Sequence, residues 1–391
     1  MSALLSVLSP AQLRACLAIR DLSDPAQGAH ALQLVVDDLA AALGSSWGAE
    51  VRVVRSSPVV SLADNYDNLG YAADAVTREE RYTRYVDAGH VLRSHSSAMI
   101  PGALRRLAAE AEARETGESG GPTVDVLLVC PGMCYRRDSI DWQHTGTPHQ
   151  VDLWRVRRDR PCTEEDLAEM IGRVVEAVLP GSRWRTEPKV HPYTDHGRQI
   201  DVCWQGRWVE IGECGLAAPG VLAGAGLPVP PWTGLAMGLG LDRLLMLGKG
   251  VPDIRLLRSA DPRVAAQMQD RTAYRPVSHQ PPVRRDLSVV VDADVDTSAE
   301  LLGDRVRAAL GADADVVETV EVLAETAYDD LPAPARARLG IAPGQRNVLV
   351  RMVVRALDRT LTDADANRLR DQVYAELHQG AASQWAAGAA R

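Results

Sequence analysis

Three short segments of the sequence combine arginine, histidine or carboxylate side chains with small or hydroxyl-bearing neighbours. They are residues 90–97 (HVLRSHSS), 134–152 (CYRRDSIDWQHTGTPHQVD) and 238–243 (GLGLDR). Arg243 lies in an otherwise apolar stretch, and a buried arginine is costly unless it faces a counter-charge. The neighbouring glycines allow a ligand or another backbone to approach closely. An anionic ligand such as a phosphate would therefore suit this arginine.

Gln150 and Asp152 alternate along a strand-like sequence, so their side chains share one face. This placement supports a joint role, although an exposed strand face would show the same spacing. The six cysteines are scattered and form no CxxC pair. We interpret them as packing residues of a protein in a reducing compartment.

In order along the chain, these segments resemble the three signature motifs of class II aminoacyl-tRNA synthetases, and specifically those of phenylalanyl-tRNA synthetase catalytic subunits. Residues 234–247 (GLAMGLGLDRLLML) are similar to the third motif, and residues 250–255 (GVPDIR) continue it. Residues 282–287 (PVRRDL) and 358–363 (DRTLTD) resemble the ferredoxin-fold anticodon-binding domain of the same family. The resemblance covers about residues 60–380, and this combination of domains on one chain resembles the organellar, single-chain enzyme.

The resemblance implies ATP and Mg²⁺ as cofactors. Arg136 would bind the α-phosphate and stabilise charge as the amino-acid carboxylate attacks it, and Arg243 would lie against the adenine and the γ-phosphate. His144 would contact the γ-phosphate side, and Glu210 would help to hold Mg²⁺ or the nucleotide. Adenylate formation requires in-line positioning and cations around the phosphates rather than a protein nucleophile. Arginine side chains with Mg²⁺ supply those cations.

The resemblance also implies how the amino acid is held. His95 and Ser97 would contact its carboxylate and amine region, and Gln150 with Asp152 would bind its ammonium group. Each assignment has a structural alternative, because arginines also serve in structural ion pairs and histidines as hydrogen-bonded core residues. Glu210 would likewise fit a strand on the protein surface.

Phenylalanine is absent from all 391 residues, whereas tyrosine occurs nine times. Where the family usually has phenylalanine, this chain has Pro148 in the second motif, and His191 and Tyr193 in the substrate pocket. Polar-edged rings favour a substrate side chain that forms hydrogen bonds, because unpaired polar groups reject an apolar analogue. Asp152 replaces the usual glutamate. The absence of phenylalanine would fit either drift in a GC-rich host or a protein made when phenylalanine is scarce or replaced by an analogue.

The composition is that of a globular protein of two or three domains, with 46% hydrophobic residues, 24% charged residues and a net charge of −9. It excludes a disordered or collagen-like chain. No apolar run approaches the roughly 20 residues of a membrane span. The N-terminal residues lack a basic flank and a clear cleavage site, so we expect no signal peptide and a cytoplasmic protein.

The expected fold class is α+β, with the antiparallel sheet and flanking helices of a class II synthetase followed by a ferredoxin-like α+β domain. We expect an N-terminal helical and strand segment (1–55) packed on the catalytic domain (56–262), then a linker (263–282) and the ferredoxin-like domain (283–391). The order strand–helix–strand–strand–helix in the last of these supports the ferredoxin-like assignment.

Capping residues and apolar periodicity predict the individual elements. Helices are expected from Ser9-Pro10 onward and over residues 31–43, 163–179, 234–247, 298–310 and 362–378. Strands are expected over residues 51–55, 124–130, 199–204, 207–212, 286–292, 316–325 and 347–357. Residues 112–122 are expected to form a surface loop, and residues 328–340 a helical insertion.

Residues 283–391 contain 13 arginines against 18 acidic residues, so the C-terminal domain is acidic. An RNA-binding domain usually presents a basic face. A local patch could still form from Arg284, Arg285, Arg336, Arg338 and Arg346.

The sequence thus predicts ATP-dependent activation of an aromatic amino acid, phenylalanine-like but more polar, as an aminoacyl-adenylate. The acceptor would be tRNA, a carrier protein or a small amine. Two alternatives stay open: a catalytically silent regulatory or ligand-sensing protein, which Pro148 favours, and an ordinary phenylalanine enzyme. No membrane partner is expected. The protein would be a monomer, or a homodimer with its interface near residues 90–104.

Overall fold

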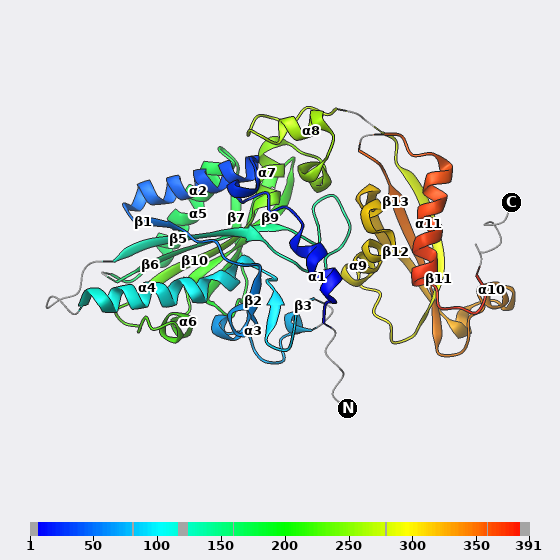
Figure 1. The fold of residues 1–391 in the computed structure, drawn as a ribbon, viewed down its shortest axis with the longest axis horizontal. Coiled ribbons are helices and arrows are strands. Elements are labelled where there is room, and N and C mark those ends of the chain that lie inside the picture. Colours follow the sequence, from blue (N-terminus) through cyan, green and yellow to red (C-terminus); the bar gives the residue numbers. More distant parts are fainter. Residues whose placement is uncertain are drawn as a thin grey trace. The chain divides into compact units, whose positions relative to one another are not determined.

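Figure 1 shows a computed structural model of the chain. It describes residues 7–79, 82–115, 124–158, 160–277, 280–357 and 359–383. The chain divides into two compact units. Unit 1 comprises Met1–Arg136, Thr147–Val251 and Ala266–Tyr274, and unit 2 comprises Arg137–Gly146, Pro252–Ala265 and Arg275–Arg391. The domain boundaries drawn from the sequence stay predictions.

Unit 1 is built on a seven-stranded sheet in the order β1-β5-β6-β10-β9-β8-β7. The strands are β1 (Glu50–Val53), β5 (Asp125–Met133), β6 (His149–Arg157), β7 (Trp184–Pro188), β8 (Thr194–Trp204), β9 (Arg207–Ala217) and β10 (Thr233–Gly240). Only β1 and β5 pair in parallel; all other neighbours in this sheet are antiparallel. The predicted antiparallel sheet with flanking helices is confirmed.

Helices cover both faces of this sheet, as Figure 1 shows. On one face lie α2 (Ala31–Trp47), α5 (Glu164–Val178) and α7 (Leu241–Lys249), which contact one another. On the other face, α4 (Ile100–Glu115) and α6 (Pro219–Gly224) share a core with Trp154 and its strand neighbours. No helix in the described residues is long and apolar enough to cross a membrane.

Helix starts follow the predicted capping residues. The Thr163 hydroxyl accepts from the Asp166 N–H, the Asp166 carboxylate accepts from the Thr163 N–H, and α5 begins at once. Ser9 and Gln12 form the same reciprocal pair at α1 (Pro10–Leu17). The predicted helices at these positions are confirmed.

The predicted helix over residues 234–247 is wrong in its first half, because Thr233–Gly240 forms β10 and α7 begins only at Leu241. β10 pairs with β6 on one side and with β9 on the other. Small residues alternate with large apolar ones along it, and all are buried except Thr233, Gly238 and Gly240, which are partly exposed. A strand covered on both faces reads as a continuous apolar run, which periodicity does not distinguish from a buried helix.

A second, three-stranded sheet leads into the region of the first motif. It has the order β2-β4-β3, from β2 (Val59–Ser61), β3 (Arg84–Tyr85) and β4 (His90–Leu92). Between β2 and β3 lie α3 (Leu62–Asn65) and the 3₁₀ turns Asp67–Leu69 and Val76–Arg78, and β4 is followed by the 3₁₀ turn Ser96–Met99. This arrangement brings the segment from β4 to α4 against the main sheet.

Unit 2 contains a three-stranded antiparallel sheet in the order β11-β13-β12. Its strands are β11 (Val283–Asp292), β12 (Val317–Ala327) and β13 (Gln345–Val354), and its helices include α9 (Ala299–Leu310), α10 (Ala333–Leu339) and α11 (Asp363–Leu377). Apolar residues of α9 and α11 share one core with the sheet. The element order is the predicted ferredoxin-like one, with a helical insertion between β12 and β13.

The insertion builds a second, smaller core in unit 2. Leu339 and Ile341 are buried with Val290 of β11, and Tyr328 and Leu331 pack against them. Because Val290 alternates with the core residues of β11, the insertion covers part of the sheet face opposite α9 and α11.

Two other predicted segments differ in detail from the structure. The predicted linker contains most of α8 (Pro262–Gln267), and Lys249 Nζ binds the carbonyl oxygens of Asp270 and Thr272 within unit 1. Helix α4 extends to Glu115, so the predicted loop over residues 112–122 begins later. Its remainder, residues 278–279 of the linker and residue 358 of the C-terminal motif lie outside the described residues.

Candidate active site

A row of register partners across β6, β10 and β9 forms the floor of the site. Asp152 pairs with Gly238, and Gly238 pairs with Glu213, so a carboxylate stands on each side of a glycine. A Cβ built on Gly238 would have Asp152 Oδ2, at 3.7 Å, as its nearest neighbour, so a methyl group would fit there in ordinary van der Waals contact. A Cβ on Gly212 would instead lie 2.1 Å from the Gly238 carbonyl oxygen. That glycine is required for close packing of the strands.

Asp152 is held by three hydrogen-bond donors. Its Oδ2 accepts from the hydroxyls of Ser96 (2.5 Å) and Ser97 (3.1 Å), and its Oδ1 accepts from Trp154 Nε1 (3.1 Å). Burial raises the pKa of Asp152 to about 6, although all three donors oppose the shift. Gln150 Oε1 accepts from the Ser96 N–H at 3.3 Å. The predicted residues Ser97, Gln150 and Asp152 are therefore together.

Aromatic rings line one side of this floor. Tyr193 stacks on Trp154 and on His191, with ring centroids 6.2 and 5.8 Å apart. Tyr71 lies 6.4 Å from Tyr193 and stacks on His95 at 5.6 Å. The three predicted pocket residues, His95, His191 and Tyr193, belong to one continuous group of rings. Tyr71 and Trp154 were not among the predicted site residues. Tyr71 lies in none of the three motifs, whereas Trp154 continues the alternation of Gln150 and Asp152 along β6 and could have been found from that spacing.

His95 is a buried, neutral imidazole. Burial lowers its pKa to about 4, the backbone of Asn65 opposes the shift, and the Arg136 charge adds to it. Neither ring nitrogen makes a well-formed hydrogen bond with another described residue. The Arg136 guanidinium is thus near enough to His95 for its charge to affect the pKa of that ring.

Glu213 is a second carboxylate of the site that the sequence analysis did not assign. Lys189 Nζ lies 2.6 Å from its Oε1, and His191 Nε2 lies 2.7 Å from its Oε2. These two partners lower the pKa of Glu213 to about 2, against the effect of burial. Lys189 also lies 3.5 Å from Glu210 Oε1, so one ammonium group serves both carboxylates.

A β-bulge explains why Glu210 and Glu213 reach the same ammonium group. The pairing of β8 with β9 skips Ile211, which is therefore the extra residue of the bulge. A bulge redirects the side chains on one side of it, so residues three apart can share a face. The main-chain carbonyl of Glu210 accepts from Arg243 Nη1 at 2.7 Å, which joins two predicted ATP-binding residues.

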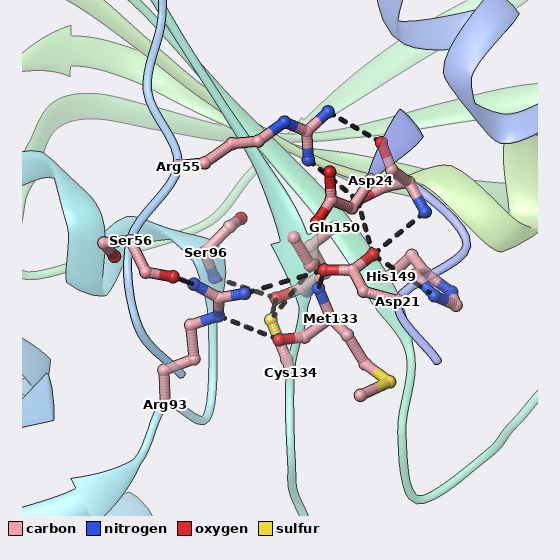
Figure 2. A network of polar contacts seen from close by, with 12 residues as sticks. Asp21, Asp24, Arg55, Ser56, Arg93, Ser96, Met133, Cys134, His149 and Gln150 are labelled. Atoms are coloured by element: carbon pink, nitrogen blue, oxygen red, sulfur yellow. Dashed lines mark hydrogen bonds and ion pairs between the residues drawn. The ribbon is translucent and has the colours of Figure 1, made fainter. Parts of the chain in front are cut away.

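A buried polar network, shown in Figure 2, anchors the first and second motifs to the N-terminal segment. Asp21 Oδ2 accepts from the Met133 N–H (2.9 Å) and lies 3.9 Å from Arg93 Nη2. Arg93 Nε in turn donates to the Met133 carbonyl oxygen at 2.8 Å. The network is extended by Asp21 Oδ1, which lies 3.7 Å from His149 Nε2.

His149 continues the network to the third motif. Its Nε2 lies 3.0 Å from the Leu22 main-chain nitrogen, whose N–H points at it. Its Nδ1 lies 2.8 Å from Asp242 Oδ1, and the His149 N–H donates to Asp242 Oδ2 at 2.5 Å. Because Asp242 immediately precedes Arg243, this chain of contacts fixes the start of α7 and the base of the Arg243 side chain.

His144, the remaining predicted residue, belongs to unit 2. Its Nδ1 lies 2.6 Å from Asp141 Oδ2, and its N–H donates to Asp141 Oδ1. Hydrogen bonds from this turn lower the pKa of Asp141, although burial opposes them. The role of His144 at ATP stays a prediction.

The described residues contain no group of three or more histidine, cysteine or carboxylate side chains placed to hold a metal ion. Mg²⁺ in nucleotide sites usually takes one or two carboxylates together with substrate phosphates. The partly exposed carboxylate of Glu210, beside Arg243, fits that kind of site.

The antiparallel sheet and the motifs gathered on it define a class II synthetase core. Residues 21–268 match the family model "tRNA synthetases class II core domain (F)", which is more than half of the chain. The chain therefore belongs to this family, and the resemblance seen in the sequence is confirmed.

Individual relatives show which enzymes of the family the chain is similar to. The chain is 26% identical over 373 residues to "Probable phenylalanine--tRNA ligase, mitochondrial" of Drosophila melanogaster (81% of this chain, 75% of the relative). It is 26% identical over 396 residues to the mitochondrial phenylalanine–tRNA ligase of Saccharomyces cerevisiae (82% and 80%). It is 31% identical over 220 residues to the phenylalanine–tRNA ligase alpha subunit of Prochlorococcus marinus (56% and 61%). The protein is an aminoacyl-tRNA synthetase-like ligase related to phenylalanine–tRNA ligase.

Proposed function

We propose that this protein activates an aromatic amino acid with a hydrogen-bonding ring as an aminoacyl-adenylate and then transfers it to tRNA. The observation that carries the proposal is the floor of Asp152, Gly238 and Glu213 beside the rings of His191 and Tyr193. An apolar phenyl ring would leave several of these polar groups without partners, which disfavours it as the substrate.

The nucleotide would be bound by charge and position. Arg136 would hold the α-phosphate, Arg243 the adenine and the γ-phosphate, and His144 the γ-phosphate side. The contact of Arg243 with the Glu210 carbonyl supports a fixed guanidinium position. Mg²⁺, held by Glu210 and the phosphates, would neutralise phosphate charge. No protein nucleophile is needed, because the amino-acid carboxylate attacks the α-phosphate.

The amino acid would be bound by its polar end and by its ring. His95 and Ser97 would contact the carboxylate and amine region, and a neutral His95 offers a donor without repelling the ammonium group. Gln150 and Asp152 would face that ammonium group. The ring would lie against Tyr193 and its neighbours, where offset stacking is favourable.

tRNA is the acceptor that the family favours, and the names of the relatives agree with it. A carrier protein or a small amine is the second candidate, because the C-terminal domain is acidic. The intact arginines and carboxylates disfavour a catalytically silent protein. Two relatives are mitochondrial by name, whereas the sequence analysis predicts a cytoplasmic protein; the compartment stays a prediction.

Amino-acid-dependent ATP–pyrophosphate exchange, measured without tRNA, tests this proposal. The panel is phenylalanine, tyrosine, 3-hydroxyphenylalanine, 4-aminophenylalanine and tryptophan. We expect exchange with at least one donor-bearing ring and little with phenylalanine. Exchange with phenylalanine alone would indicate the ordinary family substrate. ATP binding without exchange for any amino acid would favour the catalytically silent alternative. Charging of a tRNA pool with the activated amino acid then tests the acceptor.

A further inference from the structure

We infer that Glu213, together with Lys189 and His191, forms a subsite that accepts a hydrogen bond from a donor group on the ring of the substrate amino acid. The donor would be a phenolic hydroxyl, an aromatic amine or a ring N–H. This inference rests on the proposed function, because it assigns the part of the same site that reads the substrate side chain.

The first argument is the position of Glu213. Its strand partner is Gly238, whose missing side chain leaves room for at least a methyl group beside Asp152, and its carboxylate contacts His191, which stacks on Tyr193. The negative charge of Glu213 contributes to raising the pKa of both Tyr71 and Tyr193, after the effect of burial. The carboxylate therefore lies close to two of the rings that would hold the substrate.

The second argument is unused hydrogen-bonding capacity. An ionised carboxylate offers about four lone-pair sites and cannot donate. Each oxygen of Glu213 has one close partner, Lys189 Nζ or His191 Nε2, and both partners are nitrogens. The Glu213 side chain is 27% exposed to solvent. A donor group on a ligand could therefore reach Glu213 without breaking either contact.

The third argument is the contrast with the other carboxylate of the floor. Both oxygens of Asp152 already accept hydrogen bonds from Ser96, Ser97 and Trp154, and the residue is 1% exposed. Of the two carboxylates, Glu213 is thus the more accessible. Its low pKa, about 2, keeps it an acceptor throughout the working pH range.

A substrate with a plain phenyl ring would cover Glu213 without offering a hydrogen bond. Burying a charged acceptor without a new partner is costly, whereas a ring that carries a donor replaces the lost water. Sites built to hydrogen-bond a substrate group discriminate strongly against the analogue that lacks it. Glu213 is partly exposed, so we expect the scale of one net hydrogen bond to a charged group, a preference of about 10²-fold in kcat/KM for the donor-bearing ring over phenylalanine.

The test compares Glu213→Ala and the nearly isosteric Glu213→Gln with the full-length wild type. ATP–pyrophosphate exchange is measured with phenylalanine and with its 3-hydroxy, 4-hydroxy and 4-amino derivatives. In Glu213→Ala we expect the preference for donor-bearing rings to fall to threefold or less, mainly through a loss of activity on those rings. Glu213→Gln keeps one acceptor oxygen, so part of the preference should return.

Glu187→Ala is the matched control. Glu187 lies on β7 of the same sheet, its side chain is 54% exposed, and it contacts Arg185. This variant should keep the wild-type preference. Circular dichroism checks that each variant is folded, and the glutamine variant carries the test if the alanine variant is not.

The outcomes separate the subsite from the proposed function. A preference that is unchanged in both Glu213 variants would overturn the subsite and leave activation intact. A wild type that prefers phenylalanine would also overturn it. If the wild type shows no exchange, activation fails, and calorimetric binding of the same four amino acids decides the subsite. A donor preference in binding that disappears in Glu213→Ala would still support it, and its absence would refute it.

Discussion

Two guanidinium groups, those of Arg136 and Arg243, are expected to supply positive charge where the reaction develops negative charge. Arg243 Nη1 donates to the Glu210 carbonyl, and a guanidinium group presents several N–H donors in one rigid plane that matches phosphate oxygens. A lysine has one compact ammonium group, so it cannot contact the Glu210 carbonyl and a nucleotide phosphate in the same geometry.

We therefore expect Arg243→Lys to lower kcat/KM for ATP in pyrophosphate exchange by about 10²-fold, a typical cost of removing one charged contact to a transition state. Arg368→Lys on α11, an exposed ion-pair residue beside Asp313, is the control and should stay within twofold of the wild type. An Arg243→Lys enzyme that retains more than a third of its activity would contradict the assignment.

The raised pKa of Asp152 predicts how the free energy of unfolding depends on pH. Its pKa is about 6 in the folded protein against 3.8 for an ordinary aspartate, so the folded state holds this proton to a higher pH than the unfolded chain. The stability contributed by the protonated group is complete below pH 4 and is lost as the pH rises through 6. At about 1.4 kcal/mol per pKa unit, the loss is about 3 kcal/mol.

Urea unfolding at pH 4 and pH 7.5, for the wild type and Asp152→Asn, measures this effect. Relative to the variant, the wild type should lose about 2 kcal/mol of unfolding free energy over that interval, because the unfolded carboxyl group is already more than half deprotonated at pH 4. Because other groups titrate equally in both proteins, the difference isolates Asp152. Parallel pH dependences for the two proteins would show that the carboxyl group is not perturbed.

At the scale of the elements, local signals predicted helices better than they predicted the site. The Thr163 cap and the apolar stripe behind it specify α5 without help from other elements. Small and large residues alternate along Thr233–Gly240, but the sequence there is an apolar run that fits a helix equally well. The segment forms strand β10 because it pairs with β6 on one side and with β9 on the other. The bulge at Ile211 was equally invisible, because it exists only relative to β8. In a regular strand without the bulge, Glu213 and Glu210 would lie on opposite faces of the sheet. Glu213 was therefore not predicted as a second carboxylate beside Glu210.

The buried network could not be predicted either, since Asp21 and His149 are far apart in the sequence. It makes Asp21 a positioning residue for the first and second motifs, through Arg93 and Met133. Asp21→Asn removes the charge and leaves an amide donor facing the Met133 N–H or Arg93. We expect KM for ATP in exchange to rise about tenfold, and stability to fall by about 1–3 kcal/mol.

The control for this network is Asp37→Asn, which replaces an exposed carboxylate on α2. It should change neither KM nor the unfolding free energy by a measurable amount. If Asp21→Asn loses stability while its KM for ATP stays at the wild-type value, the network supports folding only, and its positioning role is refuted.

At the scale of the whole molecule, the charge of unit 2 bears on the acceptor. Of the five arginines proposed as a basic patch, Arg285 binds Asp363, Arg346 binds Glu325, and Arg336 lies over the Tyr328 ring. Within the described residues, no ion pair or ring contact engages the other two, Arg284 and Arg338.

We therefore expect the double variant Arg284→Ser and Arg338→Ser to lower kcat/KM for tRNA charging by less than tenfold, and to leave pyrophosphate exchange unchanged. Losing two phosphate contacts should also make the slope of log K against log salt shallower by at most about 2 units. Filter binding at several salt concentrations measures this slope. A loss of charging by more than a hundredfold would show that unit 2 contributes a dominant RNA contact through these two residues.

The glycines of β9 and β10 also bear on how such a site can change over time. Gly212 admits no side chain, whereas a methyl group at Gly238 would meet its nearest neighbour at an ordinary 3.7 Å. Gly240 has the same clearance, 3.7 Å. Evolution or engineering could therefore raise the floor one methyl group at a time without rearranging the sheet. The volume available to a substrate could shrink in small steps, independently of the carboxylate that would read its ring.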